Sequence, residues 1–173
     1  MIVRDATESD VPAILAIYND VLATSTAIFS DIPSKLEDRL QWLRDRRALG
    51  YPVLVATDAS GVLGFASFGD FRSWPGYRNT VEHSVHVRAD ARGRGIGAAL
   101  MRVLLDRATA LGKHVMVAGV DADNVGSIRM HERLGFRQAG TLHHVGCKFG
   151  RWLDLTFLER RLDERAAPPP GPP

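Results

Sequence analysis

Residues 82 to 98 read Glu82-His-Ser-Val-His-Val-Arg-Ala-Asp-Ala-Arg92-Gly-Arg-Gly95-Ile-Gly97-Ala98, an alternating strand, a turn rich in arginine and glycine, and the start of a helix. Glycines let the backbone approach a ligand closely, and the first amides of a helix are unpaired and lie at the positive end of its dipole. Arginines in the turn add full positive charges. The stretch therefore predicts a socket for a pyrophosphate, and with it a phosphate-bearing cofactor.

The composition is that of one globular domain. The chain has 173 residues, 45% of them hydrophobic, and we expect a single domain over 1–165 and a disordered proline-rich tail over 166–173. No apolar run is long enough for a membrane span. The charges balance to +2, which gives no reason to expect a nucleic-acid partner. Cys147 is the single cysteine, which excludes an internal disulfide and indicates a reducing, cytoplasmic location.

Hydrophobic periodicity and turn residues predict a strand, two helices, three strands, a helix, a strand, a helix and two strands. The strands are expected at 2–4, 53–57, 62–68, 80–87, 114–120, 136–145 and 152–159, and the helices are expected to begin near residues 7, 34, 95 and 125. Antiparallel strands followed by a strand-helix-strand crossover predict an α/β fold with a mixed sheet and helices on both faces.

Two kinds of phosphate site have a turn of this type. Gly93-Arg-Gly95-Ile-Gly97-Ala98 satisfies the G-x-G-x-x-G/A pattern of dinucleotide-binding turns. Such folds need several further strand-helix units after the turn, whereas about half of this chain precedes the glycines. The spacing Arg92-x-x-Gly95-x-Gly97 instead resembles the acyl-CoA pyrophosphate loop of the GNAT superfamily of N-acetyltransferases.

This resemblance implies the GNAT fold, in which two neighbouring strands of the mixed central sheet splay apart and acetyl-CoA lies between them. Strands 82–87 and 114–120 would be that pair. The implied cofactor-binding residues are Val85, His86 and Val87 on the strand, Arg92, Gly93, Arg94, Gly95, Ile96, Gly97 and Ala98 in the turn, and Asn124 and Ser127 beyond it. Asn124 could also be a simple cap of the next helix.

Acetyl transfer needs a neutral amine, and therefore a base that takes the proton of the ammonium group. Glu82 lies on the strand that leads into the turn and could act directly or through a water if burial raises its pKa; alternatively it is a surface carboxylate. His131 shares a helix face with Ser127 and could protonate the departing thiolate or assist the base. A lone helical histidine is more often structural, and the two catalytic roles stay interchangeable.

Over residues 1–162 the chain is similar to the GNAT branch that acetylates phosphinothricin, methionine sulfoximine and methionine sulfone. The similarity lies in Thr80-Val-Glu-His-Ser-Val-His-Val, Arg129-Met-His-Glu-Arg-Leu-Gly-Phe and Lys148-Phe-Gly-Arg-Trp-Leu-Asp-Leu-Thr-Phe. It implies acetylation of the α-amino group of such amino acid analogues, with a role in detoxification, and Glu82 and His131 match the positions assigned to catalysis. The sequence does not rank the three substrates.

A substrate of this class needs hydrogen-bond donors and an apolar wall. We expect Arg72 and Arg78 to clamp a carboxylate or an oxygen-rich head group, Phe29, Trp74 and Tyr77 to line the stem, and Glu82 to meet the amine. The remaining histidines lack partners at ligand spacing, so we expect no metal.

The resemblance also implies a homodimer, with Phe149, Trp152 and Phe157 either in the core or at the subunit contact. Two other functions are open. Protein N-terminal acetylation would require an open peptide groove, and a non-catalytic acyl-CoA sensor would lack a working base.

Overall fold

The computed structural model describes residues 1–169, which form a seven-stranded sheet in the order β1-β2-β3-β4-β5-β7-β6. The strands are β1 (Ile2–Asp5), β2 (Val53–Asp58), β3 (Gly61–Asp70), β4 (Thr80–Val87), β5 (Val115–Asp121), β6 (Arg137–Lys148) and β7 (Arg151–Arg161). The helices are α1 (Val11–Thr24), α2 (Leu36–Ala48), α3 (Ile96–Ala110) and α4 (Val125–Arg133). The predicted order of elements and the mixed α/β sheet are confirmed.

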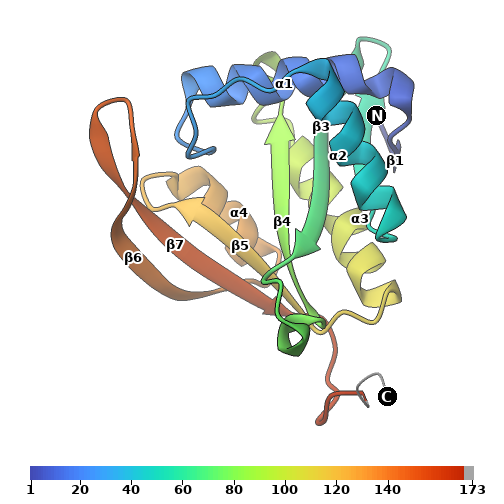
Figure 1. Cartoon of the computed structure of the whole chain (residues 1–173), viewed down its shortest axis with the longest axis vertical. Helices are drawn as coiled ribbons and strands as arrows, with labels where there is room; N and C mark the ends of the chain where they lie inside the picture. Colours follow the sequence, from blue (N-terminus) through green and yellow to red (C-terminus); the bar gives the residue numbers. More distant parts are fainter. Residues whose placement is uncertain (170–173) are drawn as a thin grey trace.

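Helices cover both faces of the sheet (Figure 1). Helices α1 and α2 pack on one face, over a core that includes Ile14, Leu43 and Phe65. Helices α3 and α4 lie on the other face, where Leu100 and neighbouring apolar side chains form a second core. Strand β3 is buried at every position between its exposed end residues because both of its faces are covered, which explains its almost continuous apolar sequence.

Strands β4 and β5 run parallel and separate after a short paired segment. They pair at three positions, the last being Glu82 opposite Val117, although β4 continues to Val87. The Arg88 N–H donates to a β3 carbonyl at 2.8 Å. Because backbone groups alternate in direction along a strand, those of Val85 and Val87 point to the β5 side, where no ladder continues. The predicted splay is therefore confirmed, and it leaves unpaired backbone groups along its edge.

A buried lysine fixes the segment between α1 and α2. Lys148 is 2% exposed, and its ammonium group donates to the carbonyls of Leu22, Ser25 and Ile28 at 2.5 to 2.8 Å. The carbonyls at the end of a helix have no partner within it, so the ammonium group acts as a cap for α1. The end of β6 thereby holds in place a segment that forms part of the site.

The β6–β7 hairpin extends away from the body of the molecule (Figure 1), and most side chains of β6 are exposed, including Cys147. Residues 166–169 are exposed and form no helix or strand; the rest of the expected tail, 170–173, lies outside the described residues. Among residues 1–169, no helix is long and apolar enough to cross a membrane. Over the same range, no group of three histidine, cysteine or acidic side chains could hold a metal ion.

Candidate active site

The turn between β4 and α3 forms one wall of a cleft of about 750 Å³. Gly93 and Gly95 have φ angles of +75° and +76°, a region that favours glycine, and a Cβ on either would extend into open space. Helix α3 begins at Ile96 with Gly95 as its N-cap, so its first amides have no partner within the helix. These amides line a cleft wall that offers several donors to an anion.

The cleft brings together the predicted cofactor-binding residues, with one exception. It is lined by Val85, His86, Val87, Arg92, Gly93, Gly95, Ile96, Gly97, Ala98, Asn124 and Ser127. The exception is Arg94, whose guanidinium lies 3.4 Å from the Asp58 carboxylate. Asn124 is the N-cap of α4, because its Oδ1 accepts the Ser127 N–H at 3.1 Å, and it lines the cleft as well.

Two arginines of the cleft were missed by the sequence analysis. Arg102 follows Ala98 by four residues on α3, and Arg133 follows Met130 by three on α4; both pairs line the cleft. Arg102 could have been predicted from the sequence, because it lies one helical turn after Ala98 and therefore on the same face of the helix. Together with Arg92, these side chains give the cleft three cationic groups, which fits a pyrophosphate.

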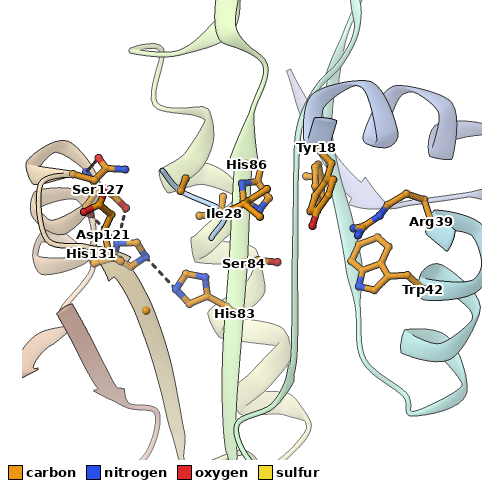
Figure 2. Close-up of a pocket in the computed structure, with 16 residues that line it drawn as sticks. Tyr18, Ile28, Arg39, Trp42, His83, Ser84, His86, Asp121, Ser127 and His131 are labelled. Carbon is orange, nitrogen blue, oxygen red and sulfur yellow. Dashed lines mark hydrogen bonds between the residues drawn. The ribbon is translucent and has the colours of Figure 1, made fainter. Parts of the chain in front are cut away.

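A second space, here called the cavity, adjoins the cleft and has a volume of about 360 Å³. The two share residues of β4 and α4, including Val85, His86 and Ser127. Figure 2 shows Asp121, Ser127 and His131 on one side of β4 and Tyr18, Arg39 and Trp42 on the other. The cavity therefore spans the splay and the sheet face that α1 and α2 cover.

Glu82 lies where β4 and β5 begin to separate, next to the cavity. Its side chain is half-buried, and a Cβ built on Gly119, a cavity residue, would be 3.1 Å from the Glu82 Oε1. Because Gly119 has no side chain, the Glu82 carboxylate can occupy the space beside it. Burial raises the pKa of Glu82 above its ordinary value, and the nearby Arg72 guanidinium opposes that effect. A carboxylate with raised proton affinity beside a cavity is suited to act as a base.

His131 is 1% exposed and reaches the cavity wall. Its Nδ1–H donates to the Ser127 carbonyl at 2.7 Å, because a carbonyl oxygen can only accept. The lone pair on Nε2 then accepts the Nε2–H of His83 at 3.1 Å, as drawn in Figure 2. Burial lowers the pKa of both imidazoles, most strongly that of His83. The two histidines form a neutral pair at neutral pH.

His83 is not among the site residues predicted from the sequence. The alternation of β4 places it on the same face as Val81 and Val85, toward α4, and that alternation was visible in the sequence. Its Nδ1 is buried and has no hydrogen-bond partner among the described residues. His83 also packs against the Phe136 ring, which encloses the pair in apolar surroundings.

None of the six expected substrate residues lines the cavity, although Glu82 adjoins it beside Gly119. Phe29 packs against β6, where its ring fills the space that a Cβ on Gly146 would need. Trp74 and Tyr77 are 73% and 44% exposed, and Arg78 is exposed and donates to a carbonyl of its own loop. The expectation that Trp74 and Tyr77 line the substrate stem is therefore not met at this cavity, because their side chains face solvent.

Arg72 does not line the cavity, but it lies near the Glu82 carboxylate. Its guanidinium lies 4.1 Å from the Phe71 ring centroid, and its charge lowers the pKa of Glu82. The apolar wall of the cavity comes instead from Tyr18, Ile28, Trp42 and Phe65, none of which the sequence analysis assigned to the site.

Comparisons with known proteins agree with this geometry. Residues 14–136 match the model of the acetyltransferase (GNAT) family. The L-methionine sulfoximine/L-methionine sulfone acetyltransferase of Pseudomonas aeruginosa is 53% identical over 168 residues, which cover 96% of this chain and 98% of that protein. The phosphinothricin N-acetyltransferase of Streptomyces coelicolor is 38% identical over 163 residues, 92% of this chain and 95% of that protein.

Two solved structures have nearly the same backbone. A Salmonella typhimurium protein solved with its cofactor acetyl-CoA has a TM-score of 0.95 and 48% identity, covering 98% of each chain. A ribosomal-protein-alanine N-acetyltransferase from Brucella melitensis has a TM-score of 0.92 and 46% identity, covering 93% of this chain and 99% of that one. The chain belongs to the GNAT family of acetyltransferases, as the turn after β4 predicts.

Proposed function

We propose that this protein uses acetyl-CoA to acetylate the α-amino group of small amino acid analogues such as methionine sulfoximine, methionine sulfone or phosphinothricin. The observation that carries the proposal is the junction of a cationic cleft and a small cavity beside a half-buried carboxylate, Glu82. Relatives that cover nearly the whole chain carry the names of these activities, which supports the same chemistry here.

The residues of the cleft fit acetyl-CoA. Arg92, Arg102, Arg133 and the first amides of α3 would hold its diphosphate. The unpaired backbone groups of Val85 and Val87 would bind its extended arm in the splay. When bound there, acetyl-CoA supplies the acetyl group as a thioester.

Glu82 is the proposed base. An α-ammonium group is largely protonated at neutral pH, so it must lose a proton before its nitrogen can attack. Glu82 would take that proton, directly or through one water, which leaves a neutral nitrogen able to attack the thioester carbonyl. As the N–C bond forms and the C–S bond breaks, the second proton that the nitrogen loses would go to the departing thiolate. His131 is neutral and has its lone pair on Nε2, so it has no proton to donate from that atom, and it can accept one there only when the hydrogen bond from His83 opens. This favours assistance to Glu82 over protonation of the thiolate.

Protein N-terminal acetylation is the second candidate, and similarity to the Brucella melitensis protein favours it. A cavity of about 360 Å³ with walls from α1, α2 and β5 is of the size that holds one small molecule. A peptide would have to leave the cavity after its first residue. The size of the cavity therefore favours free amino acids.

Thiol release measured with a panel of amines would test the proposal. We expect turnover of acetyl-CoA with methionine sulfoximine, methionine sulfone or phosphinothricin, and weak turnover with methionine or with a peptide that begins with alanine. Mass spectrometry would confirm one added acetyl group. Turnover of the peptide alone would support the second candidate, and binding of acetyl-CoA without turnover of any amine would identify a sensor and contradict the proposal.

We also propose that residues 1–165 act as one catalytic domain in a cytoplasmic homodimer. Strand β6 is an edge of the sheet, and Leu142 and Val145 on it, Phe149 in the following turn and Trp152 on β7 are between 48% and 65% exposed. Apolar side chains on an edge strand favour a contact with a second copy. Light scattering would give the mass in solution, and a monomer at micromolar concentration would contradict the dimer.

A further inference from the structure

Helix α2 contributes a guanidinium group to the cavity. The Arg39 Cζ lies 3.8 Å from the centroid of the Tyr18 ring and 5.2 Å from that of Trp42. Its Nε donates to the Ser34 Oγ at 2.9 Å, which fixes the plane of the group. Burial lowers the pKa of Arg39, yet an arginine side chain stays charged in proteins. The cavity thus contains a cation that is partly removed from water and held in place.

This cation forms no salt bridge among residues 1–169, although the charge of Asp38 acts on it. Arg44, one turn further along α2, forms an ion pair with Glu8 at 2.9 Å, but Arg39 forms no such pair. The neighbouring Asp38 raises the pKa of Arg39 less than burial lowers it, and the Asp38 Oδ2 accepts the Lys35 N–H at 2.8 Å. Aromatic faces offset only part of the cost of removing a charge from water. An anion that enters the cavity would complete the site.

The charges of the cavity are separated. Arg39 lies on the α2 side, whereas Asp121, which is 4% exposed, lies on the far side of β4, and Glu82 adjoins Gly119 of the neighbouring strand. The three histidines of the cavity are neutral at neutral pH, because burial lowers the pKa of each. A cation on one side and carboxylates on the other suit a zwitterion, which is the form of an amino acid at neutral pH.

We propose that Arg39 binds an anionic oxygen group of the amino acid substrate and thereby sets the substrate preference of the enzyme. This inference rests on the proposed function. The α-carboxylate and the phosphinate of phosphinothricin could both fill the role, since a guanidinium binds either in a bidentate manner.

The strand register favours the group at the far end of the substrate. Arg39 lies over Tyr18, whose ring is 6.2 Å from that of His86, and His86 is about 13 Å along β4 from Glu82. The amine must lie near Glu82, and the α-carboxylate is attached to the same carbon as the amine. The tail would therefore extend from Glu82 in the direction of Arg39.

The test compares Arg39→Met with Arg44→Met, a control at an exposed arginine of the same helix. Substrates are phosphinothricin, methionine sulfone and the amide of methionine sulfone, which lacks the carboxylate. We expect Arg39→Met to raise the KM for phosphinothricin by roughly 10- to 100-fold, to raise that for methionine sulfone less, and to leave the KM for acetyl-CoA unchanged. Arg44→Met should change none of these values.

If Arg39 binds the α-carboxylate, Arg39→Met should raise the KM for phosphinothricin and for methionine sulfone equally and leave the KM for the amide unchanged. This result would still support an anion site at Arg39. A uniform change for all three substrates, no change, or a raised KM for acetyl-CoA would overturn the inference. Arg39→Lys keeps the charge and serves if the methionine variant unfolds; we expect a smaller loss from it, because the ammonium group cannot bind in a bidentate manner.

Calorimetric titration of phosphinothricin into the protein saturated with coenzyme A separates this inference from the proposed function. A wild-type protein that acetylates none of the substrates contradicts the proposed function alone. Binding of phosphinothricin that is lost in Arg39→Met would still support the anion site in that case. Equal binding by the wild type and by Arg39→Met would contradict the site whatever the activity.

Discussion

The environment of Glu82 makes it the residue on which the proposed reaction depends. Its carboxylate is half-buried beside Gly119, and burial raises its pKa. Glu82→Gln keeps the shape and removes the base, so we expect kcat for methionine sulfone to fall by about 10²- to 10⁴-fold. The KM for acetyl-CoA should not change, because the carboxylate does not line the cleft. Steady-state kinetics would show this, with Glu37→Gln, at an exposed carboxylate of α2, as the control.

A retained kcat together with weaker binding of acetyl-CoA would contradict this assignment. It would place Glu82 among the cofactor contacts and leave the proton without an acceptor.

Arg72 provides a second test of the same carboxylate. Its positive charge lowers the pKa of Glu82 against the effect of burial. In Arg72→Gln only burial remains, so the pKa of Glu82 rises further. Because the active form of Glu82 is unprotonated, kcat/KM declines as the pH falls through this pKa, and the acid limb of the profile should move to higher pH. Arg78→Gln, in the same exposed loop, should leave the limb in place.

At the scale of elements, glycine and proline positions made most boundaries predictable. The strand expected at 80–87 is β4 with the same bounds, and the helix expected near residue 95 begins at Ile96. The hairpin at the end of the chain was harder. Strand β6 was expected to stop at residue 145 but continues to Lys148, because Phe149 adopts a φ of +51° and forms the turn with Gly150. A positive φ at phenylalanine is rare, so no pattern of turn residues announced it.

The turn before α3 can be tested with a matched pair of glycines. Gly95 precedes α3 and Gly112 follows it, with φ angles of +76° and +69°, and a Cβ on either would meet no other atom. Alanine at either site should lower the free energy of unfolding by about 1 to 2 kcal/mol, because both adopt the left-handed conformation. Gly95→Ala should also raise the KM for acetyl-CoA by roughly tenfold, since its methyl group enters the cleft.

Urea denaturation and steady-state kinetics would measure the two effects separately. If Gly112→Ala weakened acetyl-CoA binding as much as Gly95→Ala, the effect would come from strain in the helix and not from the cleft.

At the scale of the whole molecule, the cleft was predictable from one stretch of sequence and the cavity was not. Residues 92–98 are continuous, so their function can be read locally. Tyr18, Arg39 and Trp42 belong to two helices whose contact with β4 depends on how those helices cross the sheet. Periodicity identifies the inward face of a helix, but it does not specify which residues that face will meet. The exposed Trp74 loop was therefore assigned to a cavity whose apolar wall other elements supply.

Three histidines whose pKa values are lowered by burial, His83, His86 and His131, should make stability depend on pH. Burial lowers the pKa of His83, His86 and His131 from 6.5, in the case of His86 to about 4. Below pH 6.5 the unfolded chain binds protons that the folded chain does not, so the free energy of unfolding falls as the pH falls. For His86 the loss amounts to about 3 kcal/mol between the two pKa values, at about 1.4 kcal/mol per pH unit.

The histidines can be separated from the carboxylates by the choice of pH. Asp10, whose pKa Arg4 lowers to about 2, loses its contribution only below the ordinary carboxylate range. Above that range Glu82, whose pKa burial raises, opposes the decline as a single group against three histidines. Urea denaturation from about pH 7 down to about pH 4.5 should give a steep decline in the wild type. His86→Phe keeps a ring against Tyr18 and Phe65 and removes one titrating group, so its decline should be shallower by about 1.4 kcal/mol per pH unit. A wild-type stability that stays constant over this range would mean that the folded protein admits protons to these imidazoles, and the neutral pair that supports His131 as an acceptor would then be wrong.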